Sequence, residues 1–106
     1  MSKAYLIDAT NRVVTEIAVN GLSDLQGAVG GYIEIAYSWP NGDTLYVNEE
    51  GLFHRPAGWF SLKERPDQMF AGDGVLVGEE FGGGGSTRDP KLTLEELKQK
   101  IGYFYS

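Results

Sequence analysis

The sequence has no cysteine and a single histidine, His54. Without cysteine the chain has no disulfide, no thiolate nucleophile and no cysteine-based zinc site. No apolar run approaches the roughly 18 to 20 residues that span a bilayer. The opening residues, MSKAYLIDATNR, do not have the form of a signal peptide, because an aspartate interrupts their short apolar stretch. We therefore expect a cytoplasmic protein with no membrane partner.

The chain also lacks an excess of basic residues. It has 9 Lys and Arg against 15 Asp and Glu, a net charge of −6. The acidity is concentrated in residues 1–50, which hold seven acids and two bases. Direct binding to nucleic acid relies on a basic surface that releases counterions, so we expect none here. An acidic face either keeps a protein soluble or meets a basic surface on a partner.

Alternating apolar residues and turn signals predict antiparallel strands. Residues 4–9 and 13–19 are expected to form a hairpin. A second hairpin, from 32 to 48, is expected to turn at Pro40, Asn41 and Gly42, with Gly42 in the left-handed conformation. Asn48 begins a further turn, NEEG, in which its side chain bonds the backbone. Val75 to Val77 predict a short strand, whereas residues 52–70 read as a packed loop with a short strand or helical turn.

Two helices complete the predicted fold. Residues 22–29 carry a capping-box pair, Ser23 and Gln26, and Thr93 with Glu96 forms a second pair before a helix over 93–101. The fold class is thus α+β, a small and mainly antiparallel sheet of four to five strands with one short helix and a C-terminal helix. We divide the chain into a β-rich domain (1–81), a Gly-rich flexible linker (82–91) and a C-terminal helix with an aromatic tail (92–106) docked on the same domain.

Catalytic and metal sites are both weakly indicated. His54 is the one side chain that titrates near neutrality, but no nucleophile or orienting carboxylate is placed around it by the sequence. Glu49 and Glu50 could bind a metal with Asp43 or Asp73, yet adjacent residues on a strand point to opposite faces. We therefore assign no catalytic residue, metal or cofactor.

A partner-binding surface is the first hypothesis. Aromatic residues dominate the energetics of protein interfaces, and Trp39 at the tip of the second hairpin is expected to be exposed. With Asp43, Glu49, Glu50 and Trp59 it would suit a basic, groove-bearing partner. The second hypothesis is a small-ligand module that binds or sequesters a nucleotide, with Arg55, Arg88 and the Gly-rich tract contacting phosphates.

Three segments resemble a known family. GLSDLQGAVGGYIEIAY, YVNEEGL and AGDGVLVG, spread over roughly residues 1–80, are similar to an uncharacterised family of short proteins encoded by phages and plasmids. This chain has FHRPAGWF where that family has Leu-Pro-Pro-Asn-Arg after the turn. The resemblance implies an origin in a mobile element and no known activity.

The expected function is therefore a non-enzymatic protein that binds and inhibits a host defence or nucleic-acid-handling protein, of the anti-CRISPR or anti-restriction type. The alternatives are the nucleotide-binding module and a structural domain of unknown function. The sequence leaves the oligomeric state open, and a detached tail exchanged between protomers would make a dimer.

Overall fold

The computed structural model describes residues 2–50, 58–79 and 87–105. These residues form nine strands and two helices, so the fold is α+β and mainly antiparallel, as predicted. The expected four to five strands in one sheet were too few, because there are two sheets. The elements in chain order are β1 Ser2–Asp8, β2 Val13–Val19, α1 Leu22–Val29, β3 Ile33–Ser38, β4 Asp43–Asn48, β5 Gly58–Leu62, β6 Arg65–Ala71, β7 Gly74–Glu79, β8 Thr87–Arg88, α2 Leu94–Lys100 and β9 Ile101–Tyr105.

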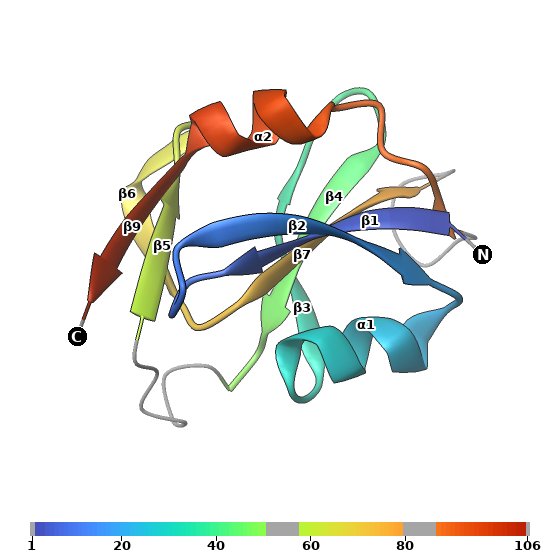
Figure 1. Cartoon of the computed structure of the whole chain (residues 1–106), viewed down its shortest axis with the longest axis horizontal. Helices are drawn as coiled ribbons and strands as arrows, with labels where there is room; N and C mark the ends of the chain where they lie inside the picture. The colour runs from blue at the N-terminus through green and yellow to red at the C-terminus, as the bar shows by residue number, and fades with distance from the viewer. Residues whose placement is uncertain (1, 51–57, 80–86, 106) are drawn as a thin grey trace.

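The large sheet has the order β2-β1-β7-β4-β3, with the short β8 paired to β7. The small sheet has the order β6-β5-β9. Every described pair of strands is antiparallel. Figure 1 shows the small sheet to one side of the large sheet, with α1 and α2 at opposite ends of the molecule in this view.

Alternation along the strands of the large sheet builds a core on each face. Leu45 and Leu76 point to one face, where they pack with Phe60 of the small sheet and Leu97 of α2. Their neighbours point to the other face and pack with Leu25 of α1; among them are Tyr46, Val75 and Val77. The small sheet and α1 therefore cover opposite faces of the large sheet.

Both predicted hairpins are present. β1 and β2 pair from Asp8↔Val13 outward. In the second hairpin the Trp39 amide donates to the Asp43 carbonyl at 2.8 Å, and Gly42 has a φ of 95°, in the left-handed region that the turn requires. Local signals therefore fixed both turns.

Residues 52–70 were expected to be a packed loop with a short strand or helical turn, and their described part contains more strand than that. Residues 58–71 form the hairpin β5–β6, and the closing aromatic residues form strand β9, which pairs with β5. Phe60, Leu62 and Phe70 alternate with residues on the opposite face of the small sheet, and all three are buried in the core that it shares with α2. Gly58 and Pro66, which are typical of turns and loops, had obscured this alternation in the sequence.

The two capping-box predictions had different outcomes. Thr93 and Glu96 exchange both hydrogen bonds of a capping box at the start of α2. At α1 the N-cap is Gly21, and no side chain caps the helix, so the Ser23–Gln26 pair was wrong. Asp24 accepts a hydrogen bond from the Asn20 amide instead. Neither helix in the described parts of the chain is long and apolar enough to cross a membrane.

Candidate functional site: an acidic cleft between the sheets

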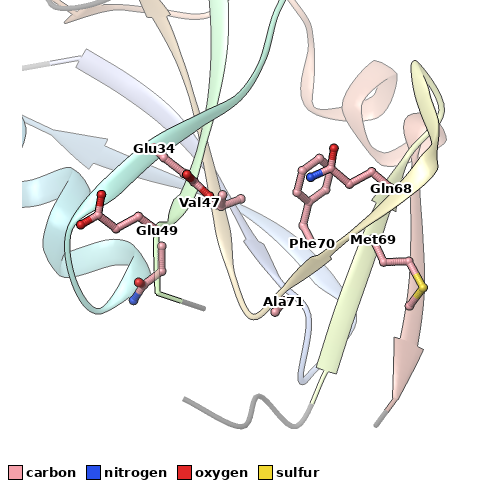
Figure 2. A pocket seen from close by; sticks show the side chains of 8 residues that line it. Glu34, Val47, Glu49, Gln68, Met69, Phe70 and Ala71 are labelled. Carbon is pink, nitrogen blue, oxygen red and sulfur yellow. The ribbon is translucent and has the colours of Figure 1, made fainter. Parts of the chain in front are cut away.

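A cleft of about 110 Å³ lies between strand β6 and the open end of the β3–β4 hairpin, away from its turn. Its two walls come from different sheets (Figure 2). The residues that line it are Glu34, Val47, Asn48, Glu49, Gln68, Met69, Phe70 and Ala71. In the described structure β3 is one end strand of the large sheet, and β6 is one end strand of the small sheet. The cleft therefore lies between the edges of the two sheets.

The register of the hairpin forms the first wall. Glu34 pairs with Val47, so both side chains lie on the same face of the large sheet. Glu49 follows Val47 by two residues, and its amide donates to the Tyr32 carbonyl at 3.0 Å. Asn48 secures the turn because its Oδ1 accepts from the Glu50 amide and its Nδ2 donates to the Val29 carbonyl of α1. The predicted role of Asn48 in bonding the backbone is confirmed.

Strand β6 forms the second wall. Phe70 is buried against Phe60, with ring centroids 5.3 Å apart, and this contact places β6 over the core. Arg65 spans the two sheets: its Nη1 donates to the Ala36 carbonyl at 3.2 Å and its Nη2 donates to Gln68 Oε1. Figure 2 shows the side chains of Glu34 and Gln68 pointing into the gap from opposite walls.

The cleft combines an acidic rim with an apolar floor. Glu34 and Glu49 are exposed, and among the described residues neither carboxylate takes part in an ion pair. None of the described residues that line the cleft is basic, whereas Val47, Phe70 and Ala71 are buried. Such an arrangement suits a cation on an apolar stem, as in a lysine or arginine side chain.

Two of the predicted partner-binding residues lie inside the protein. Asp43 has no exposed surface, and its carboxylate accepts hydrogen bonds from the backbone amides of Lys91 and Leu92 and from the Arg88 guanidinium. Trp39 is only 9% exposed, and its indole N–H donates to Glu64. In this conformation neither side chain is available to a partner, and we leave both out of the candidate surface.

The other predicted partner-binding residues lie at the surface. Glu49 and Glu50 are exposed at the end of the β3–β4 hairpin. Trp59 is half-buried in the centre of the small sheet, where it pairs with Ala71 of β6 and Phe104 of β9. Since Ala71 also lines the cleft, the structure brings Trp59 close to it.

The residues of the nucleotide hypothesis are placed differently. The guanidinium of Arg88 already donates to the Asp43 carboxylate, to the Asn41 carbonyl at 2.7 Å and to the Asp89 carbonyl at 2.8 Å. It is therefore committed to the chain's own oxygen atoms. Arg55, His54 and the glycine tract 82–85 lie outside the described residues. Within the described ranges there is also no group of three or more His, Asp or Glu that could hold a metal.

Sequence reasoning missed Glu34 and Gln68. Alternation along residues 32–37 places Glu34 on one face of a strand, and the hairpin register puts it opposite Val47. The sequence offered the alternation as a signal, but it gave no sign of the β-bulge between Ile35 and Tyr37 that shifts the register by one residue. Nothing in the sequence pointed to Gln68, because its position depends on how the small sheet packs against the large one.

The comparisons with known proteins concern almost the whole chain. Residues 1–101 match the profile of DUF3846, a domain of unknown function. The chain belongs to the DUF3846 family. This match is consistent with the likeness of the three sequence segments to an uncharacterised family. No curated protein and no solved structure is similar enough to the chain to count as a match. Membership in DUF3846 brings no activity with it, so a function has to be argued from the cleft itself.

Proposed function

We propose that this DUF3846 protein is a non-enzymatic binding protein that engages a basic protein surface through the acidic cleft. The observation that carries the proposal is the pair Glu34 and Glu49, two exposed carboxylates that line the cleft and form no ion pair among the described residues. Opposite charge across an interface speeds association and selects the partner. The overall charge of −6 acts in the same direction.

The resemblance to phage and plasmid proteins narrows the kind of partner. A small acidic protein from a mobile element benefits from disabling a host enzyme that handles nucleic acid, because such enzymes present basic grooves. The proposed partner is therefore a host defence or nucleic-acid-handling protein, and the proposed outcome is inhibition by occupation of its basic groove.

The test is capture from a bacterial lysate with the immobilised protein at low and at high salt. The decisive variant is Glu34→Lys with Glu49→Lys, and the matched control is Glu16→Lys with Glu95→Lys, which changes the net charge equally at exposed sites elsewhere. We expect the wild type and the control to retain basic nucleic-acid-binding proteins at low salt and to release them at high salt. The cleft variant should retain them at least about tenfold less.

Equal retention by the two double variants would show that net charge, and not the cleft, attracts the captured proteins. A set of captured proteins with no basic members would also contradict the proposal. Circular dichroism of each variant checks that the fold is intact, since both substituted positions in each pair lie at the surface.

A further inference from the structure

Strand β3 ends the large sheet with an unpaired edge in the described structure. Its inner edge pairs with β4, where Tyr32 O accepts from the Glu49 amide and Glu34 lies opposite Val47. In an antiparallel ladder the residues alternate between those that bond the neighbour and those that point away. The amides and carbonyls of Ile33 and Ile35 are consequently directed outward, away from β4.

Beyond Ile35 the outer edge of β3 is not available to pair with another strand. The register shifts between Ile35 and Tyr37, which marks a β-bulge, and the Ala36 carbonyl accepts a hydrogen bond from Arg65. The bulge also moves Tyr37 onto the core face, against Trp39, and not onto the face of Ile33 and Ile35 that strict alternation predicts. The open part of the edge is therefore the short run from Ile33 to Ile35.

Side chains on the two faces of this edge differ in character. On the face that carries α1, Ile35 is 51% exposed although it is a large apolar residue in a strand. On the cleft face, Glu34 is exposed beside Tyr32, which is 67% exposed. Exposed apolar edge strands are sites of pairing with another chain unless the protein guards them. A strand added to β3 would place alternate side chains next to Ile35 and next to Glu34.

Charge decides which strand fits. A second copy of this chain, paired about a two-fold axis at Glu34, would bring two Glu34 carboxylates directly opposite one another, and like charges in that position are destabilising. A lysine or arginine there would face Glu34 at the close distance of a non-hydrogen-bonded pair, and Glu49 lines the same cleft. The edge of β3 therefore disfavours pairing with the β3 strand of a second copy and favours a strand with a basic residue opposite Glu34.

We propose that β3 receives an extended segment of a partner protein as an added edge strand, with a lysine or arginine beside Glu34 and apolar residues beside Ile33 and Ile35. Main-chain hydrogen bonds to Ile33 and Ile35 supply the pairing, and the alternation of apolar and basic residues supplies the selectivity. This inference rests on the proposed function, because Glu34 belongs to both the cleft and the edge.

The probe is a blocked synthetic peptide, Thr-Ile-Lys-Ile-Thr, titrated into the isotope-labelled protein. We expect the amide signals of Ile33 and Ile35 to shift and their hydrogen exchange to slow. A peptide with glutamate in place of lysine should bind at least about tenfold more weakly. Methylating the peptide nitrogens of both isoleucines removes donors that face β3 and should weaken binding by about tenfold or more. Methylating the nitrogen of the lysine, which points away from β3, should leave affinity within about twofold.

On the protein side, Ile35→Pro removes the outward donor without removing a ladder hydrogen bond, and Ile35→Thr is the control that keeps it. Binding should be lost in the first variant and kept in the second. The methylated peptides test the same bonds if the proline variant fails to fold. Equal affinity for the two methylated peptides, or no binding of the lysine peptide up to about 1 mM, overturns strand addition.

Two outcomes separate this inference from the proposed function. If the Glu34 and Glu49 reversals abolish capture from lysate while the peptide does not bind, the acidic cleft stands and strand addition fails. If capture is unaffected by those reversals, the proposed function fails and the inference fails with it. A dimer of the free protein that Ile35→Pro converts to a monomer would show that a second copy occupies the edge, which also overturns the inference.

Discussion

The buried carboxylate of Asp43 and the guanidinium of Arg88 lie 3.3 Å apart, although 45 residues separate them in the chain. The same carboxylate accepts the backbone amides of Lys91 and Leu92 at 3.0 and 2.8 Å. Asp43 therefore ties the segment before α2 to the start of β4. Strand β8 adds a second attachment, because Arg88 pairs with Gly78 and Thr87 with Glu79.

Replacing Asp43 should be among the most destabilising changes at a polar position. Asp43→Ala removes the charged acceptor of Arg88 and the acceptor of the Lys91 and Leu92 amides, the second of which is buried. We expect a loss of roughly 2 to 4 kcal/mol in the free energy of unfolding. Urea denaturation measures it. The control Glu95→Ala removes only an exposed contact with Lys98 and should cost less than about 1 kcal/mol. Similar losses in the two variants would refute the assignment of a buried structural role to Asp43.

Trp39 should behave as a core residue with one polar contact. Trp39→Phe keeps most of the apolar bulk but removes the indole donor to Glu64, and we expect a loss of about 1 to 2 kcal/mol. Because Lys100 also contacts Glu64 at 3.1 Å, the carboxylate keeps one partner. Urea denaturation followed by circular dichroism gives the value. A substitution with no effect on the urea midpoint would contradict the buried position of Trp39 and its contact with Glu64.

Leu97 tests how firmly α2 is held. It has no exposed surface and lies in the core between the two sheets. Leu97→Ala should cost about 2 to 5 kcal/mol through lost burial and the cavity left behind. The exposed neighbour Lys98→Ala serves as the control and should cost less than about 1 kcal/mol. A small effect of Leu97→Ala on the urea midpoint would show that α2 is detached from the rest of the domain in solution.

Tyr46 makes the free energy of unfolding depend on pH in the alkaline range. Its hydroxyl contacts Glu79 in the core under α1, and burial, followed by the hydrogen bond to Glu79 and its charge, raises the pKa of Tyr46 above the ordinary value near 10. The folded state keeps a proton that the unfolded state loses, so stability is fully present below about pH 10 and falls as the pH rises further.

Tyr46→Phe should therefore reduce the slope of stability against pH in the alkaline range, while costing about 1 kcal/mol at neutral pH. Burial also raises the pKa values of Tyr5 and Tyr103, so part of the slope will remain. Urea midpoints at neutral pH and above about pH 10 provide the comparison. An unchanged alkaline slope in the variant would argue against the raised pKa of Tyr46.

Local signals predicted the local structure well. The Pro-Asn-Gly turn placed Gly42 in a left-handed conformation, and the Thr93–Glu96 pair began α2, because each depends on residues within four positions of one another. The hairpin 58–71 was missed for a related reason. Gly58 and Pro66 are residues typical of turns and loops, and they obscured the alternation that identifies a strand.

The candidate site was predicted only in part. Glu49 and Glu50 are exposed as expected from their charge, whereas Asp43 and Trp39 were assigned to the surface from their place at a hairpin tip. What buries Asp43 is the segment from Arg88 to Leu92, which arrives from the other end of the chain. The sequence of residues 39–43 gives no sign that this distant segment packs over Asp43.

By itself the sequence determined the acidic charge, the α+β class, the hairpin turns and the cap of α2, because these depend on composition and on residues close together in the chain. Only the tertiary structure decided that there are two sheets. It also decided that Asp43 is buried and bonded to the segment from Arg88 to Leu92, and that Glu34 and Glu49 line one cleft with Gln68. Those facts depend on contacts between distant segments, and the same charged side chain is a surface group or a core group according to what packs over it.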